Sequence, residues 1–181
     1  MRPNVPPAGK QSDFDFLIGK WRVKHHTLRG RLTGATKWDV ADAIDIVSPA
    51  FGGMGNIGQF MRLIDNEPYV GMPIRLFDPG AMFWRIYWLD TRDQRMEPPI
   101  IGGFDGDVGL FFGDDILRGE PIRIRFLWKD ITDLSARWEQ AFSPDGGASW
   151  EVNSVMEFIR DDTLPDHPQF PISTCQEIHH G

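Results

Sequence analysis

Residues 137–158 read RWEQAFSPDGGASWEVNSVMEF, and this stretch decides the fold. Polar and apolar residues alternate on both sides of its centre, which is the pattern of two strands that each bury one face. At the centre, Pro144 presets one backbone dihedral, Asp145 can accept hydrogen bonds from its own backbone, and the two following glycines permit positive φ angles. The chain has to reverse here, so the sequence predicts a β-hairpin.

Similar alternation recurs along most of the chain, and no long helical pattern is evident. Strand candidates, with ends defined to within about two to four residues, lie near 18–29, 36–47, 56–64, 70–77, 82–89, 99–104, 108–112, 120–128, 134–142 and 150–159. A short helical turn, capped by Asp13, is predicted before the first strand. About ten short antiparallel strands have to hide their edges, and closure into one up-and-down barrel does this most simply. We therefore predict an all-β barrel, with a two-sheet sandwich as the alternative.

Composition limits the function classes. The 181 residues, of which 41% are hydrophobic, suffice for one domain with a core. The 19 basic and 26 acidic residues give a net charge of -7, the wrong sign for a general binder of nucleic acid or anionic membrane. The single cysteine, Cys175, forbids an intrachain disulfide, and the N-terminus lacks an apolar segment of signal-peptide length. We expect a cytoplasmic protein with no nucleic-acid or membrane partner.

Three parts are predicted along the chain. Residues 1–12 are rich in proline and form a loose N-terminal arm, and residues 13–160 form the barrel. Residues 161–181 form a tail, because Pro165, Pro168 and Pro171 prevent a regular strand ladder. The glycine-rich stretch 52–58 is interpreted as a flexible loop at the barrel mouth.

Strand parity sorts the side chains of the later strands into two faces. The predicted inner face is mostly apolar or aromatic and comprises Trp84, Ile86, Trp88, Ile122, Ile124, Phe126, Trp128, Trp138, Gln140, Phe142, Val152, Ser154, Met156 and Phe158. The predicted outer face is mostly charged and comprises Arg85, Tyr87, Arg123, Arg125, Leu127, Arg137, Glu139, Glu151, Asn153 and Glu157. The barrel interior is therefore expected to be apolar.

Segment 14–21, FDFLIGKW, resembles the opening Gly-x-Trp strand of the lipocalin and fatty-acid-binding (calycin) superfamily. More closely, the chain is similar to a bacterial group of lipocalin-like proteins of unknown function. Further similar segments are RLFDP at 75–79, IYWLD at 86–90, the prolines and glycine of 98–102, PIRIRF at 121–126 and RWEQAFS at 137–143. The likeness covers roughly residues 13–160. It implies a barrel whose interior binds a small molecule, and it brings no established activity.

Three residues are candidates for acid–base chemistry. If Trp21 points into the barrel floor as in lipocalins, parity sends His25 inward and His26 outward. An imidazole with an ordinary pKa near 6.5 suits proton transfer, although a buried histidine is as readily a structural group. Asp90 and Glu139 lie next to aromatic residues in the sequence and could act as bases if burial raised their pKa. The alternative for both is a solvated or ion-paired carboxylate.

Arginines and tryptophans are the candidate ligand-binding residues. A guanidinium in an apolar wall can bind a carboxylate, phosphate or enolate, so Arg75 and Arg125 are candidates. Parity favours an outward Arg125, paired with a surface glutamate, and leaves Arg75 open. Seven tryptophans and 13 phenylalanines favour a cavity for flat apolar molecules. The expected walls are Trp84, Trp88, Trp128 and Trp138, and the alternative is that these rings are simply core.

Other chemistry finds little support in the sequence. His25 and His26 are adjacent, so on a strand they face opposite sides and cannot bind one metal together. His179 and His180 lie in the predicted tail, where Cys175 also has no partner cysteine. We expect neither a metal nor a cofactor. Ser143, Asp145, Gly147, Ser149 and Trp150 match the turn pattern called the Asp-box in sialidases, which is a folding device.

Three function classes follow. The leading hypothesis is a barrel that binds a small, largely apolar aromatic molecule. If an arginine faces inward, that molecule should also carry an anionic group. The alternative is a lyase, isomerase or cyclase in the same cavity, with His25 and Asp90 or Glu139 as an acid–base pair and Arg75 as an anion clamp. A third class is a dimerising interaction module, a homodimer whose interface is formed by the aromatic faces.

Overall fold

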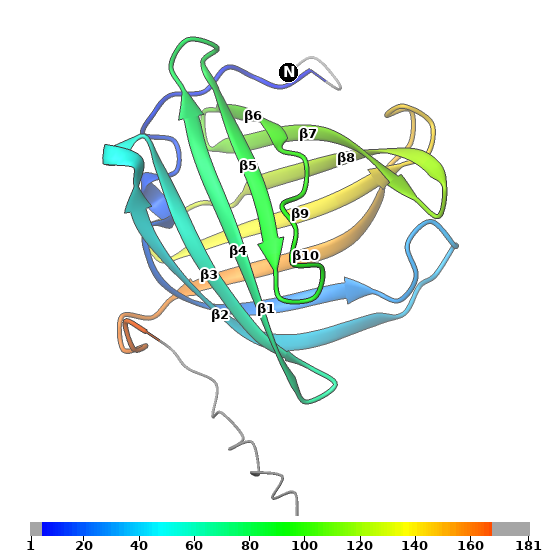
Figure 1. Ribbon diagram of the computed structural model, residues 1–181, viewed down its shortest axis with the longest axis horizontal. Coiled ribbons are helices and arrows are strands. Elements are labelled where there is room, and N and C mark those ends of the chain that lie inside the picture. Colours follow the sequence, from blue (N-terminus) through cyan, green and yellow to red (C-terminus); the bar gives the residue numbers. More distant parts are fainter. Residues whose placement is uncertain (1–4, 168–181) are drawn as a thin grey trace, which may run out of the picture.

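The computed structural model describes residues 5–167, and these form one closed barrel of ten antiparallel strands (Figure 1). The strands are β1 (Gly19–Leu28), β2 (Trp38–Ala50), β3 (Gly55–Ile64), β4 (Glu67–Asp78), β5 (Phe83–Asp90), β6 (Ile100–Asp105), β7 (Val108–Leu117), β8 (Glu120–Lys129), β9 (Ser135–Ser143) and β10 (Glu151–Arg160). Each strand pairs with its neighbours in sequence, and β10 pairs with β1 to close the ring. The predicted all-β up-and-down barrel of the lipocalin and fatty-acid-binding type is confirmed, and the sandwich is excluded.

Two short 3₁₀ turns lie at one end of the barrel. The first, η1 (Asp15–Leu17), is the predicted turn before β1, and the second, η2 (Phe51–Gly53), connects β2 to β3. Phe14 and Leu17 are 1% and 0% exposed and belong to the buried core, and the Phe14 ring packs among aromatic rings at this end, the closed end of the barrel. These rings include Trp84, Phe104, Phe111 and Trp128. Figure 1 shows η1 at one end of the barrel and the β1–β2 loop at the other.

Arg160, the last residue of β10, fastens the closed end. Its guanidinium lies 4.2 Å from the ring centroid of Trp21 and donates hydrogen bonds to the carbonyl oxygens of Ile18 (2.9 Å) and Phe16 (2.7 Å). Gly19 has a φ of 132°, and a Cβ there would collide with Arg160 Nη1. The glycine of the Gly-x-Trp segment is therefore required both by its backbone angle and by the arginine beside it.

The predicted hairpin forms, and its turn is held by side chains. Ser143 Oγ donates to Asp145 Oδ1 (2.7 Å) and accepts from the backbone N–H of Gly147 (2.7 Å). The Asp145 carboxylate accepts from both the backbone N–H and the hydroxyl of Ser149, and the Trp150 indole donates to the Gly147 carbonyl. The Asp-box residues thus connect the two ends of the loop.

A β-bulge alters the predicted faces of β10. The pairing of β10 with β9 shifts register between Val152 and Ser154, so Val152 lies opposite Ala141 on the outer face and Glu151 opposite Phe142 on the inner face. The parity prediction is therefore wrong for Glu151, Val152 and Asn153. It is confirmed for Ser154, Met156 and Phe158, which all lie beyond the bulge.

The described ends of the chain lie against the barrel. The backbone N–H of Gly9 donates to the Met82 carbonyl (2.7 Å), and the Trp84 indole donates to the Lys10 carbonyl (2.9 Å). At the other end, Lys20 Nζ lies 2.7 Å from Asp166 Oδ1. Residues 1–4 of the predicted arm and 168–181 of the predicted tail, with Cys175, His179 and His180, lie outside the described residues.

The glycine-rich stretch 52–58 does not lie at the mouth. Gly52 and Gly53 belong to η2 at the closed end, where the Gln11 side chain donates to the Gly53 carbonyl, and 55–58 begin β3. The expectation of a mouth loop is wrong because β1 leaves the closed end and β2 returns to it. Over residues 5–167, no helix is long and apolar enough to cross a membrane.

Candidate functional site

The barrel encloses a cavity of about 370 Å³. Its lining runs from Trp128 and Phe158 near η1 to Arg31, Asp93 and Glu97, which belong to loops at the opposite end. Eight aromatic side chains contribute to the wall, namely Phe60, Tyr69, Trp88, Phe126, Trp128, Trp138, Phe142 and Phe158, and the rest of the lining includes many polar and charged residues. A volume of this size lies at the lower end of the range for small-molecule pockets. The volume and the mixed lining therefore suit a compact molecule that has both aromatic and polar parts.

The four predicted tryptophan walls do not all reach the cavity. Trp88, Trp128 and Trp138 line it, whereas Trp84 is 2% exposed and packs against Phe14 and Phe77 at the closed end. Trp84 and Trp88 share a face of β5, but the step of four residues from one to the other separates them by about 13 Å along the strand. Parity identifies the inner face of a strand and says nothing about depth.

The predicted charged residues divide into two groups. His25, Arg75 and Asp90 line the cavity. Arg125 pairs with Ala141 on the outer face, where its Cζ lies 4.7 Å from the Trp150 ring centroid. Glu139 is also on the outer wall, paired with Lys129 (2.9 Å) and Arg137 (2.8 Å). Arg125 and Glu139 therefore cannot contact a molecule in the interior.

The contacts of His25 fix its protonation. Arg62 Nη1 lies 3.1 Å from His25 Nδ1, and because a guanidinium can only donate, Nδ1 must be the acceptor. The ring proton is then on Nε2, which lies 2.8 Å from Ser154 Oγ. Burial, together with the charges of Arg62 and Arg31, lowers the pKa of His25 to about 3. The imidazole is neutral at physiological pH.

This arrangement makes His25 a weak base. In a nucleophile–histidine pair, the other ring nitrogen donates to a carboxylate that stabilises the imidazolium. Here the corresponding nitrogen faces the Arg62 guanidinium, which destabilises the imidazolium. His25 and Ser154 are therefore hydrogen-bonding groups of the wall and do not form an activated pair.

Asp90 is saturated with hydrogen bonds. Its carboxylate accepts from Tyr69 Oη (2.9 Å), Trp88 Nε1 (2.9 Å) and the backbone N–H groups of Arg92 (2.8 Å) and Asp93 (3.0 Å). Burial pushes the pKa of Asp90 upward, but these hydrogen bonds outweigh it and hold the pKa below the ordinary value. Asp90 is an ionised group that orients Tyr69 and Trp88.

Two cations that the sequence analysis missed face the cavity. Arg31 comes from the β1–β2 loop, with its Cζ 5.3 Å from the Phe142 ring centroid, and Arg62 comes from β3, with its Cζ 5.6 Å from that of Tyr69. Both are half-buried, and burial lowers the pKa of both guanidiniums. Within residues 5–167 neither forms an ion pair with a carboxylate, and Arg62 Nε has no hydrogen-bond partner. The acidic residues Asp114 and Asp115 of the lining are exposed at its rim.

Arg62 had a sequence signal and Arg31 had none. Arg62 lies two residues after Phe60, so the alternation of β3 places both on the inner face. Arg31 lies in a loop, where no periodicity applies. Among the described residues, no group of three or more His, Cys, Asp and Glu side chains is placed to hold a metal ion.

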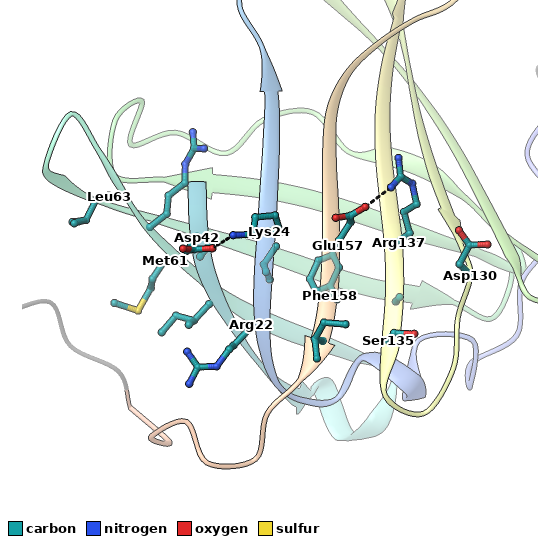
Figure 2. A pocket seen from close by; sticks show the side chains of 16 residues that line it. Arg22, Lys24, Asp42, Met61, Leu63, Asp130, Ser135, Arg137, Glu157 and Phe158 are labelled. Atoms are coloured by element: carbon teal, nitrogen blue, oxygen red, sulfur yellow. Dashed lines mark hydrogen bonds and ion pairs between the residues drawn. The ribbon is translucent and has the colours of Figure 1, made fainter. Parts of the chain in front are cut away.

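A second hollow of about 930 Å³ lies on the outer wall (Figure 2). It crosses β1, β2, β3, β9 and β10, and many of its side chains point away from the interior. Its charges largely neutralise one another, as in Lys24 with Asp42 (2.5 Å) and Arg137 with Glu157 (2.7 Å), both drawn in Figure 2. The hollow is larger than the cavity but presents paired charges, so the interior is the better candidate site.

Comparison with solved structures finds matches at low sequence identity. One is the S-type phycobiliprotein lyase CPES from Guillardia theta, with a TM-score of 0.56 and 10% sequence identity over 85% of this chain and 93% of that chain. Another is a protein of unknown function from the DUF3598 family of Nostoc punctiforme, with a TM-score of 0.40 and 10% identity over 87% of this chain and 53% of that one. Comparison with protein families found no match, and comparison with curated proteins found none either. The likeness to the lyase concerns the fold and supports the lipocalin-like barrel, while membership of the bacterial lipocalin-like group stays a prediction.

Proposed function

We propose that the protein binds a small aromatic molecule with an anionic group inside the barrel, and that Arg31 and Arg62 bind the anion. The observation that carries the proposal is the pair of half-buried guanidiniums without a carboxylate partner in the described chain. A cation removed from water without a partner is unfavourable, and a carboxylate, sulfonate or phosphate of a ligand relieves this cost. Guanidiniums are also the side chains best suited to bidentate binding of such groups.

The surroundings of the arginines support the same ligand. Phe142 and Tyr69 lie under the two guanidiniums, so a flat ring can continue from the anion into the aromatic walls. His25 accepts from Arg62 and thereby holds that side chain toward the cavity. His25 is therefore a positioning residue in this proposal.

The enzyme alternative has less support. A lyase, isomerase or cyclase using His25 and a carboxylate needs a base whose pKa lies near neutrality. The predicted acid–base residues do not supply it, because the pKa of His25 is about 3, the pKa of Asp90 is lowered, and Glu139 lies outside the cavity. Burial raises the pKa of Asp45, which lines the cavity, to about 6, so Asp45 is closer to that range than the predicted residues. The similar solved structure is named as a phycobiliprotein lyase, so an enzyme stays the alternative function.

Two fluorescent probes that share one ring system test the proposal. 1-Anilinonaphthalene-8-sulfonate is anionic, and N-phenyl-1-naphthylamine has the same rings without the sulfonate. We expect Arg62→Met and Arg31→Met each to weaken binding of the sulfonate about tenfold or more, since a charge-assisted hydrogen bond is lost. Binding of the neutral probe should change less than about twofold.

Arg22→Met, on the outer wall, is the matched control and should change neither affinity. The proposal fails if the wild-type protein binds both probes equally well, or if the arginine substitutions weaken both to the same extent.

A further inference from the structure

A second polar site lies deeper in the same cavity, apart from Arg31 and Arg62. Asp45 of β2 and Arg75 of β4 flank β3 and both line the cavity. They are 2% and 4% exposed, so both charges are removed from bulk water. Buried opposite charges normally form a direct, hydrogen-bonded pair.

Asp45 and Arg75 do not form that pair. Arg75 Nη1 donates to Asn56 Oδ1 (2.9 Å), while Arg75 Nε is buried without a hydrogen-bond partner in the described part of the chain. Burial raises the pKa of the Asp45 carboxyl to about 6, against the lowering effects of Arg75 and the Gln59 backbone, and Asp45 Oδ1 is likewise without a partner among residues 5–167. The two charges influence each other electrostatically without contact. A donor and an acceptor are thus both unused at one end of the cavity.

The space beside Asp45 depends on a glycine. Gly58 occupies the inner position of β3 between Asn56 and Phe60. A Cβ on Gly58 would lie only 2.9 Å from Asp45 Oδ1 and 2.8 Å from Pro73 Cγ. The absence of a side chain at Gly58 therefore leaves the carboxylate oxygen unobstructed.

A third unused group belongs to the same region. Trp128 is 3% exposed, and its indole Nε1 has no hydrogen-bond partner within the described chain. The centroid of its ring lies 6.0 Å from Arg75 Cζ. Two donors, on Arg75 and Trp128, and one acceptor, on Asp45, are therefore unused among the residues that line the cavity.

A hydroxyl group matches this set, because it donates one hydrogen bond and accepts others. We propose that Asp45 and Arg75 bind a hydroxyl group of the ligand, which donates to Asp45 Oδ1 and accepts from Arg75. This inference rests on the proposed function. Together, the two sites define the ligand as an aromatic molecule with an anionic group near Arg31 and Arg62 and a hydroxyl group at the deeper end. A trapped water molecule is the competing occupant. If water fills the site, the protein should bind ligands with and without the hydroxyl group with equal affinity.

Neutral probes isolate this site from the arginine pair. 2-Naphthol carries the hydroxyl, and 2-methoxynaphthalene has the same rings and oxygen but no hydrogen to donate. Neither has an anion, so the result does not depend on Arg31 or Arg62. We expect the wild-type protein to bind 2-naphthol about tenfold more tightly than 2-methoxynaphthalene, measured by the fluorescence of the probes.

The variant that removes the site is Asp45→Leu combined with Arg75→Met. Replacing one charge alone would strand the other in the interior, whereas replacing both with apolar side chains is often tolerated. The preference for 2-naphthol should fall to less than about twofold in this double variant, and the outer-wall control Glu157→Gln should retain it. Circular dichroism establishes that the double variant is folded.

The inference is overturned if the wild-type protein shows no preference for 2-naphthol, if it binds neither neutral probe, or if the double variant keeps the preference. Equal binding of the sulfonate and the neutral probe by the wild-type protein, or equal weakening of both by the Arg31 and Arg62 substitutions, would reject the proposed anion site alone if the naphthol preference is intact.

Discussion

His25 illustrates how neighbours determine the chemistry of a single residue. From the sequence it is an inward histidine with an ordinary pKa near 6.5. In the barrel, Arg62 occupies one ring nitrogen and Ser154 faces the other, and the pKa falls to about 3. The alternation of β1 predicts its inward position, but the partner that removes its basicity comes from another strand.

Stability should therefore depend on pH through His25. Its pKa in the folded protein is below the ordinary value, so between about pH 3 and 6.5 the unfolded chain binds a proton that the folded protein does not. The contribution of His25 to stability is complete above pH 6.5 and is lost as the pH falls. Urea unfolding at pH 7 and pH 4 should show that wild-type protein loses about 3 kcal/mol relative to His25→Gln over this interval. An equal pH dependence in both proteins would contradict the assigned tautomer and burial.

Some of the charged residues of the interior could be predicted from the sequence pattern, and others could not. Asp45 and Arg62 lie at inner positions of their strands, so alternation alone would have placed them inside. Charges generally prefer water, and this rule argues against placing them inside. The rule is wrong wherever an interior binds polar groups. Arg31 could not be found, because a loop residue has no periodicity.

At the scale of elements, the β9–β10 hairpin was predictable in its turn and unpredictable in its register. The turn residues act locally, so their chemistry is visible in the sequence. The bulge depends on a contact across strands, in which Gln140 Nε2 donates to Asn153 Oδ1 (2.8 Å) and Asn153 becomes fully buried. Alternation carries no signal for one extra residue in a strand.

The turn itself can be tested at Ser143. Ser143→Ala removes the hydroxyl that accepts from the Gly147 backbone N–H in a fully buried position. We expect a loss of about 1–3 kcal/mol in the free energy of unfolding, because a buried donor loses its acceptor. Ser149→Ala, on the exposed side of the same turn, should cost less, about 0.5–1.5 kcal/mol. Urea unfolding of both variants compares the two, and an equal or larger loss for Ser149→Ala would contradict the assigned role of Ser143.

At the scale of the whole molecule, strand number and closure were predictable because the turns are strongly marked. Alternation within strands does not say which end of a barrel is open, and the loop at 52–53, expected at the mouth, lies at the opposite end. An up-and-down barrel alternates its connections, so once Trp21 marks the floor, the β1–β2 loop must lie at the mouth and η2 at the floor. Counting connections from Trp21 would have placed both loops correctly.

Closure of the barrel should depend on Arg160 more than on any outer arginine pair. Its guanidinium connects the end of β10 to residues 16–18 and to the β8–β9 loop, because it donates to the carbonyl oxygens of Phe16, Ile18 and Asp133 while it lies over Trp21. A lysine keeps the charge but cannot make these contacts together, so Arg160→Lys should lower the free energy of unfolding by about 2–4 kcal/mol.

Arg137→Lys provides the comparison, because it alters an arginine that pairs with carboxylates on the outer wall. Such surface pairs contribute about 0–1 kcal/mol, and this variant should unfold close to the wild-type protein. Arg160 does not line the cavity, so Arg160→Lys should retain wild-type affinity for anilinonaphthalene sulfonate at temperatures where it is folded. A small loss of stability in Arg160→Lys would mean that η1 and the aromatic rings around it close the barrel without the arginine.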